Sequence, residues 1–193
     1  MYRVCVFCGS RHGSDPRHAA AARALGAELA ARGAGLVYGG GNVGLMGEVA
    51  GAAIAAGGHV LGVIPTSLAE KELAYAGATE LVEVGTMHER KALMADRSDA
   101  FVALPGGYGT MDELFEILTW AQLGIHAKPV VLLNSAGFFD PLLAWADHLV
   151  REGFLRPQHR ALIRVAATVP DVFPALSAPG PAPDVKWATP DER

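Results

Sequence analysis

The sequence predicts a single α/β domain with a Rossmann-like, doubly wound parallel sheet, and three observations predict it. Short apolar runs alternate with longer segments of helical periodicity, as in right-handed βαβ units. The runs are apolar at nearly every position, which is typical of strands covered by helices on both faces. Glycine-rich turns follow several runs, at the strand ends where such sheets bind ligands. A length of 193 residues suits one domain.

The first strand and helix are predicted within the first 33 residues. Residues 4–8 form an apolar run rich in valine, as in a buried strand. Asp15 and Pro16 then predict a helix start, with Asp15 as the cap and Pro16 in the first helical position. Apolar side chains recur at helical spacing until Arg32-Gly33, where the helix is expected to stop.

The rest of the chain repeats this order. The elements expected up to residue 97 are a strand (36–38), a helix stopped by Gly57-Gly58 (45–56), a strand ended by Pro65 (60–64), a loop without a clean period (66–79), a short strand (81–84) and a helix with charged flanks (87–97). Those beyond it are a strand (100–104), a helix (110–123), a strand (130–133), a helix (138–152) and a short strand (162–166). The predicted domain covers residues 1–176. The Pro-rich composition of residues 177–193 favours a disordered or loosely attached tail.

Composition argues against several classes of protein. The net charge is −4 without a long run of like charge, so no nucleic-acid partner is expected. No apolar stretch reaches the roughly 18 residues of a membrane span, and the first residues lead into a strand pattern rather than a signal peptide. Two cysteines argue against a disulfide scaffold. A cytoplasmic protein without a membrane partner is therefore expected.

Cys5 and Cys8 spell C-x-x-C, which raises the question of a metal or redox site. A redox pair would sit at a helix N-terminus, whereas these two fall in or at the end of a predicted buried strand. A zinc site would need four ligands, and the sequence has no second cysteine pair and no His-x-x-x-His pair. Buried packing is the favoured interpretation, and no metal and no cofactor are expected.

Three turns rich in glycine or serine follow three predicted strands and would line one crevice. They are Gly9-Ser10-Arg11, the run of residues 39–47 and the run of residues 105–110. Residues 39–44 contain G-x-G-x-x-G, but the next strand ends Val63-Ile64-Pro65 without the acid that a dinucleotide site requires. A phosphate or nucleotide cradle is therefore favoured over an NAD site.

The third turn opens a predicted helix, whose first N–H groups and dipole favour a bound anion. Glu113 lies beside this seat, where it would serve either as a reactive carboxylate or simply as a favourable acid in the first turn of a helix. Arg90 would either hold a phosphate or carboxylate in the crevice or belong to a solvated, charged helix start. These residues alone leave both alternatives open.

Together these segments resemble the LOG (Lonely Guy) family of cytokinin-activating phosphoribohydrolases, which are often mislabelled as lysine decarboxylases. The similarity runs from about Val4 to Ile163 and leaves the tail outside. The matching segments are 8–10, 37–41, 44–47, 62–65, 87–91 and 118–126, with Lys128-Pro129 and the signature Pro105-Gly106-Gly107-Tyr108-Gly109-Thr110 followed by Glu113.

The resemblance implies hydrolysis of the N-glycosidic bond in N6-substituted adenosine 5′-monophosphates and in AMP, giving a free base and ribose 5-phosphate. By position, Arg90 and Glu113 would be catalytic. The residues expected to bind substrate are Gly9, Ser10, Gly40, Gly41, Met46, Glu72, Lys91, Gly106, Gly107, Tyr108, Gly109, Thr110, Met111, Asp112 and Thr119. The resemblance also implies a homodimer.

The chemistry of these residues agrees with that role. Loss of a purine builds oxocarbenium-like positive charge on the ribose, which a carboxylate such as Glu113 stabilises while it activates water. Arg90 would orient Glu113 or the ribose and complement the phosphate. A non-catalytic nucleotide carrier or sensor remains an alternative. A lysine decarboxylase would need pyridoxal phosphate, and the sequence offers no strong case for a Schiff-base lysine.

Overall fold

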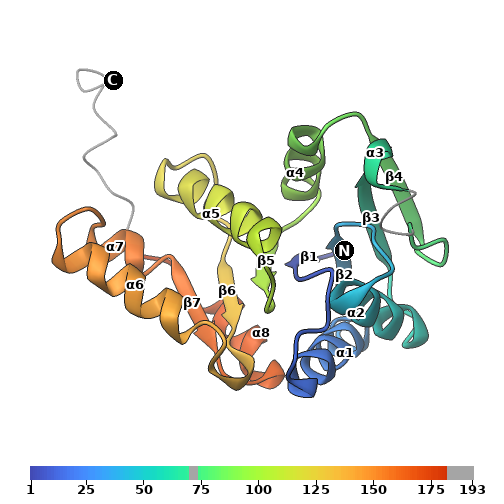
Figure 1. Ribbon diagram of the computed structural model, residues 1–193, viewed down its shortest axis with the longest axis horizontal. Helices are drawn as coiled ribbons and strands as arrows, with labels where there is room; N and C mark the ends of the chain where they lie inside the picture. Colours follow the sequence, from blue (N-terminus) through green and yellow to red (C-terminus); the bar gives the residue numbers. More distant parts are fainter. Residues whose placement is uncertain (70–73, 182–193) are drawn as a thin grey trace.

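A seven-stranded parallel sheet forms the centre of the molecule, with strand order β4-β3-β2-β1-β5-β6-β7 (Figure 1). The computed structural model describes residues 1–69 and 74–181. The strands are β1 (Arg3–Phe7), β2 (Gly35–Tyr38), β3 (Val60–Pro65), β4 (Glu80–Val84), β5 (Ala100–Ala103), β6 (Val130–Leu133) and β7 (Ile163–Ala166). Every neighbouring pair is parallel, which confirms the predicted doubly wound, Rossmann-like α/β fold.

Helices cover both faces of this sheet. They are α1 (Pro16–Ala31), α2 (Gly44–Ala55), α3 (Thr66–Ala69), α4 (Met87–Asp96), α5 (Tyr108–Gln122), α6 (Asp140–Arg151), α7 (Pro157–Arg160) and α8 (Val169–Ser177), with a 3₁₀ turn η1 (Ser135–Gly137). One apolar cluster joins α1, α2 and α8 to one face of the sheet. A second cluster joins α4, α5 and α6 to the other face.

Alternation along β1 divides its side chains between these two clusters. Val4 and Val6 belong to the cluster with α1 and α2, whereas Cys5 and Phe7 belong to the cluster with α4 and α5. Successive side chains of a strand point to opposite faces, so a central strand between two helix layers must be apolar throughout. This arrangement explains the continuous apolar runs in the sequence.

The structure corrects some of the sequence predictions. The stretch expected to be a loop over residues 66–79 begins with α3 and contains a bridge between Gly41 and Ala74. Helices α7 and α8 and the turn η1 were not predicted, and α5 begins two residues earlier than expected. Residues 182–193 of the predicted tail lie outside the described residues, so the domain boundary stays a prediction. No helix in the described part of the chain has the length and apolar character needed to span a bilayer.

The order of the strands reverses at β1, which pairs with β2 on one side and β5 on the other. In an open parallel sheet, ligands bind at this switch point, beyond the carboxyl ends of the strands. The turns after β1, β2 and β5 are the three predicted to line a crevice. The topology therefore brings them to one place.

Candidate active site

A cavity of about 210 Å³ lies at the switch point of the sheet. Its walls come from the ends of β1 and β2, the start of α4 and the start of α5. The residues that line it are Val6, Cys8, Gly9, Ser10, Gly39, Met46, Met87, Arg90, Gly107, Tyr108, Gly109, Thr110 and Glu113. Both predicted catalytic residues and seven of the predicted binding residues are in this set, so the structure brings them together.

Glycine is required where the turns approach one another. The N–H of Gly9 donates to the carbonyl of Pro105 at 3.0 Å, and the carbonyl of Gly9 accepts from the N–H of Leu45 at 3.0 Å. A Cβ atom on Gly106 would overlap the side chain of Thr110 and come within 2.9 Å of the Gly9 nitrogen. A Cβ atom on Gly39 would overlap the guanidinium of Arg90. The glycines therefore let three backbone turns and one large cation occupy a small space.

The start of α5 forms part of the cavity wall and has no side-chain cap. Gly107 occupies the N-cap position, where it provides no side-chain cap, and the first turn contains no acidic residue. The first N–H groups of a helix have no partner within it, and the helix dipole favours an anion there. Tyr108, the first residue of α5, is 96% exposed.

Arg90 on α4 is 5% exposed and is held firmly in place. Its Nε donates to the carbonyl of Val63 at 3.1 Å, and its NH2 group donates to the carbonyl of Gly39 at 2.7 Å. NH1 lies 3.8 Å from the sulfur of Met87. A planar guanidinium fixed by the ends of two strands is an oriented charge, so its position beside the cavity depends little on side-chain freedom. The solvated helix start that the sequence also allowed is therefore wrong for Arg90.

Glu113 lines the cavity from α5, as Met87 and Arg90 do from α4. Its charge and that of Arg90 both act on the buried thiol of Cys8 in the cavity wall. Burial raises the pKa of Cys8 well above its usual value, the Glu113 carboxylate adds to the rise, and the Arg90 guanidinium opposes it. A negative and a positive group therefore lie near the same buried thiol in the cavity wall, where charges interact more strongly than in bulk water.

Cys5 and Cys8 are free and buried, as the favoured interpretation of C-x-x-C predicted. Burial raises the pKa of Cys5 as well, and the nearby Glu113 charge adds to this. Neutral thiols of this kind are poor metal ligands and poor nucleophiles. No group of three or more potential metal-ligating side chains occurs among residues 1–69 and 74–181.

Lys91 lies next to Arg90 but faces α5 rather than the cavity. Its Nζ lies 3.0 Å from Oδ2 of Asp112 and 3.2 Å from Oε2 of Glu116. Burial disfavours the charged ammonium, but the two carboxylates outweigh this effect and raise the pKa of Lys91 above its usual value. Lys91 and Asp112, both expected from the resemblance to bind substrate, are therefore paired with each other.

The remaining predicted binding residues lie at different distances from the cavity. Gly40 and Gly41 hold the chain that follows residue 73, because the Gly40 carbonyl accepts from Tyr75 and Gly41 forms the bridge to Ala74. Thr119 lies near the far end of α5, and its hydroxyl donates to the carbonyl of Phe115. Gly106 and Met111 adjoin the lining residues, and Glu72 lies outside the described residues. The roles expected for these residues stay predictions.

Sequence reasoning missed Val6, Cys8, Gly39 and Met87 as lining residues. Met87 precedes Arg90 by three residues, which is the spacing of neighbours on one helix face, so that signal was available. Gly39 is the first residue after β2, but only the structure shows that it contacts Arg90.

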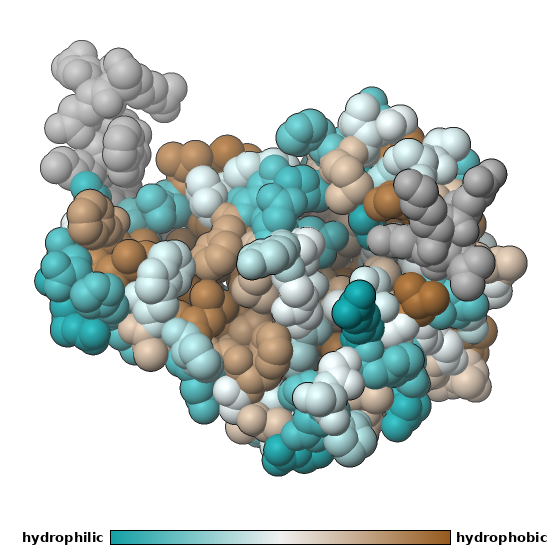
Figure 2. Space-filling view, in the orientation of Figure 1, coloured by the Kyte–Doolittle hydropathy of each residue, from teal (hydrophilic) through white to brown (hydrophobic). Residues whose placement is uncertain are grey.

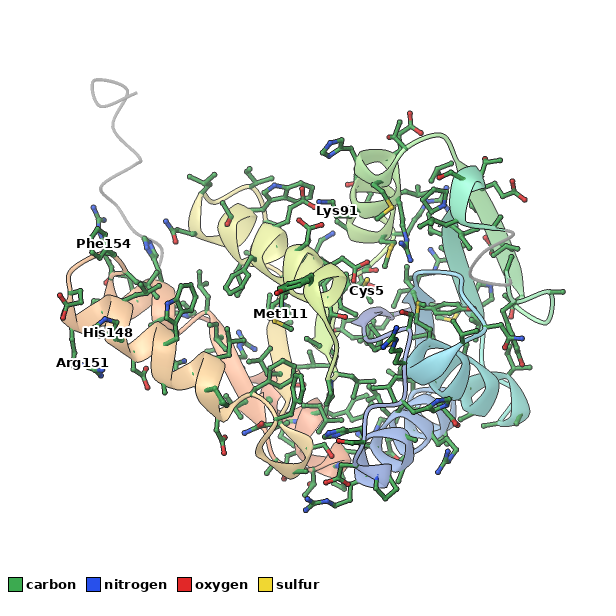
Figure 3. All side chains as sticks on the ribbon, in the orientation of Figure 1. Cys5, Lys91, Met111, His148, Arg151 and Phe154 are labelled. Atoms are coloured by element: carbon green, nitrogen blue, oxygen red, sulfur yellow. The ribbon has the colours of Figure 1, made fainter. Side chains whose placement is uncertain are left out.

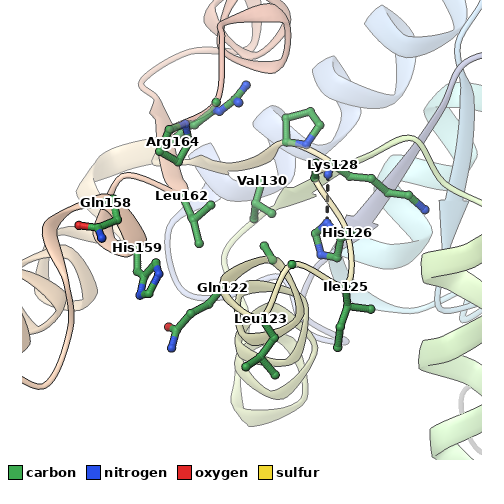
Figure 4. Close-up of a pocket in the computed structure, with 16 residues that line it drawn as sticks. Gln122, Leu123, Ile125, His126, Lys128, Val130, Gln158, His159, Leu162 and Arg164 are labelled. Atoms are coloured by element: carbon green, nitrogen blue, oxygen red, sulfur yellow. Dashed lines mark hydrogen bonds between the residues drawn. The ribbon is translucent and has the colours of Figure 1, made fainter. Parts of the chain in front are cut away.

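A larger cavity of about 580 Å³ lies at the C-terminal end of α5 (Figure 4). Its wall includes His126, Lys128, His159 and Arg164, and the N–H of Lys128 donates to Nδ1 of His126 at 3.0 Å. None of the described residues that line it is acidic, and it contains no residue predicted to be functional. Its chemistry therefore offers no carboxylate for hydrolysis, and the smaller cavity is the better candidate.

Comparison with known proteins finds a matching family model and several similar proteins. A family model described as "Possible lysine decarboxylase" matches residues 46–176. A probable cytokinin riboside 5′-monophosphate phosphoribohydrolase of Oryza sativa subsp. japonica is 59% identical over 174 residues, which cover 90% of this chain and 77% of that protein. A cytokinin riboside 5′-monophosphate phosphoribohydrolase of Arabidopsis thaliana is 50% identical over 182 residues, which cover 94% of this chain and 80% of that protein.

Solved structures share the fold at lower identity. The Moco carrier protein of Chlamydomonas reinhardtii superposes with a TM-score of 0.68 at 24% identity, over 90% of this chain and 94% of that chain. This likeness shows the fold alone.

Proposed function

The chain belongs to the LOG family of phosphoribohydrolases, and we propose that it hydrolyses cytokinin riboside 5′-monophosphates and AMP in the cavity between α4 and α5. Its relatives carry the name of enzymes that cleave the N-glycosidic bond of a nucleotide. The products are a free adenine-type base and ribose 5-phosphate. The observation that carries the proposal is that Arg90 and Glu113 line one cavity beside the start of α5. The first turn of that helix contains no acidic residue.

The phosphate of the substrate binds at the start of α5 in this proposal. Backbone N–H groups of residues 107–110 donate to the phosphate oxygens, and the helix dipole adds to the attraction. A volume of about 210 Å³ is below the range of about 300–1,000 Å³ common for whole small-molecule sites. In this proposal the cavity holds the ribose with the phosphate at its α5 wall, while the base extends beyond it.

Glu113 acts on the ribose as its bond to the base breaks. The bonding electrons leave with the base, C1′ becomes positively charged, and the carboxylate stabilises that charge. Glu113 also accepts a proton from the water whose oxygen forms the new bond to C1′. Arg90, fixed by the carbonyls of Val63 and Gly39, orients Glu113 or the ribose. The departing base takes up a proton from solvent water, and the proton on Glu113 returns to solvent, so that water is split between the base and C1′.

Identification of the products tests the proposal. Chromatography after incubation with isopentenyladenosine monophosphate should show free isopentenyladenine and ribose 5-phosphate in equal amounts. Parallel incubation with AMP tests the wider substrate range. A carrier or sensor, the alternative left by the sequence, would return the nucleotide unchanged, and a phosphatase would release phosphate and leave the nucleoside intact.

We also propose that the protein is a cytoplasmic homodimer with a small nucleotide as its partner, and with neither nucleic acid nor membrane as a partner. Large apolar side chains are well exposed at Tyr108, Ile125, Trp145 and Phe154. In Figure 2, apolar surface lies over and beside α5 among hydrophilic surface. Such exposure supports a second copy as the covering partner.

A further inference from the structure

Consecutive charged residues occur on both α4 and α5, and one of them joins the two helices. Arg90 and Lys91 are consecutive on α4, and Asp112 and Glu113 are consecutive on α5. Arg90 and Glu113 line the cavity. Lys91 instead projects toward α5, as Figure 3 shows, where its Nζ lies 3.0 Å from Asp112 and 3.2 Å from Glu116. The Lys91 side chain is only 10% exposed, whereas Glu116 is 24% exposed and Asp112 is 60% exposed, so the carboxylates form the solvent side of the contact.

The two helices rest on different parts of the sheet. Helix α4 packs against β3 and β4, whereas α5 packs against β1. Their relative position sets the separation of Arg90 from Glu113, because each residue comes from one of the two helices. A largely buried lysine side chain whose ammonium contacts two carboxylates of the facing helix is suited to fixing that position.

We propose that Lys91, Asp112 and Glu116 form a clamp between α4 and α5, in which Lys91 and Glu116 are positioning residues for the reaction rather than contacts to the substrate. This proposal rests on the proposed function. The family resemblance implies no role for Glu116. It implies substrate binding for Lys91, and the clamp gives Lys91 a positioning role instead. The clamp fixes α4 relative to α5 and therefore Arg90 relative to Glu113 in the cavity, where a displacement of about 1 Å can cost on the order of 100-fold in rate.

The charge of the cluster argues against a phosphate at Lys91. One ammonium and two carboxylates leave a net charge of −1, which repels a phosphate dianion. The start of α5 lacks acidic residues and is the better seat.

A charge exchange tests the clamp. The single variant Lys91→Glu places three carboxylates together and should lower kcat about 10- to 100-fold, because α4 and α5 separate. The double variant Lys91→Glu with Glu116→Lys again combines one ammonium with two carboxylates, and Lys at 116 also lies four residues after Asp112 on the same helix, a favourable spacing. It should recover kcat to within about threefold of the wild type, as expected for residues coupled to each other. Lys91→Met, which keeps the length without the charge, should lose kcat with a smaller change in KM.

Hydrogen exchange of the α4 amides provides a readout independent of turnover. Exchange should rise in Lys91→Glu and return toward wild type in the double variant, while melting temperatures show that all three variants are folded. A folded double variant as inactive as Lys91→Glu would overturn the proposal, because the ammonium would then be needed at position 91 itself. Full kcat in Lys91→Met would overturn it as well. Failure of the proposed function would look different, because the wild type itself would then release no base.

Discussion

At the scale of single residues, the fit between Gly39 and Arg90 determines the shape of the site. The NH2 group of Arg90 donates to the Gly39 carbonyl, and a Cβ atom at this position would overlap the guanidinium. Gly39→Ala should therefore displace Arg90 and lower turnover on the order of 100-fold, while the strands around it stay folded. Steady-state release of base measures the effect.

Gly51→Ala is the matched control for Gly39→Ala. A Cβ atom on Gly51 would meet the Tyr75 hydroxyl at 3.7 Å, an ordinary contact, so this variant should keep wild-type turnover. Equal activity of the Gly39 and Gly51 variants would show that the position of Arg90 does not limit the reaction.

The sequence predicted the core of the candidate site but not all of its members. Arg90, Glu113, Ser10 and Met46 were expected in one crevice and line one cavity. Lys91 and Thr119 do not line it. A family pattern gives positions along a helix, but successive residues of a helix point about 100° apart, so it cannot specify which of them face the cavity. The direction of each side chain depends on packing that only the fold provides.

At the scale of elements, Asp15 is the N-cap residue of α1 and is expected to stabilise the start of this helix. Its carboxylate accepts from the N–H and the side chain of Arg17, and these contacts lower its pKa to about 2. Because the pKa is lowered on folding, the carboxylate stabilises the folded state at pH values above about 4, the pKa in the unfolded chain. This stabilisation is lost as the pH falls toward 2. Asp15→Ala should therefore lower the melting temperature at neutral pH and match the wild type near pH 2.

Asp15→Asn is the control, because asparagine also caps a helix. The melting temperature of Asp15→Asn at neutral pH should be higher than that of Asp15→Ala. If both variants had the melting temperature of the wild type at pH 7, the contacts of Asp15 would contribute nothing to the stability of α1.

The start of α5 predicts how strongly catalysis depends on the phosphate of the substrate. Its acid-free first turn is the proposed phosphate seat, so most of the recognition of the nucleotide should depend on the phosphate. AMP should have a kcat/KM at least 100-fold above that of adenosine, because an unphosphorylated ribose leaves those N–H groups unpaired. Initial rates for the two substrates provide the measurement, and equal rates would exclude the phosphate seat at α5.

Strongly patterned elements were predicted, whereas short and irregular ones were not. Helix α1 begins and ends where Asp15, Pro16 and Arg32-Gly33 indicated. Helices α3 and α7 have four residues each, too few to show a helical period, and α8 contains Pro174 inside it. Such elements are stabilised by contacts with the rest of the molecule, as where Arg164 donates to the carbonyls of Ala175 and Leu176 at the end of α8.

At the scale of the whole molecule, the doubly wound sheet places the proposed chemistry at one switch point, and the proposed homodimer would cover exposed apolar side chains elsewhere on the surface. Light scattering at micromolar concentration should give the mass of a dimer, about twice 20.2 kDa. Replacement of the exposed Phe154 and Trp145 by serine tests whether these side chains contribute to the interface. A wild-type protein that is monomeric at this concentration would contradict the homodimer.

The central claim is that Glu113, in the cavity shared with Arg90, stabilises the charge that forms on the ribose. Glu113→Gln keeps the size of the side chain and removes its charge, so release of base from saturating isopentenyladenosine monophosphate should fall on the order of 10²- to 10³-fold. The dissociation constant of the nucleotide should change far less, because the ribose is uncharged before the bond breaks. Glu152→Gln, an exposed carboxylate beyond the end of α6, should behave as the wild type. The most direct measurement is the single-turnover rate of base release by Glu113→Gln, for which a rate near that of the wild type would contradict the claim.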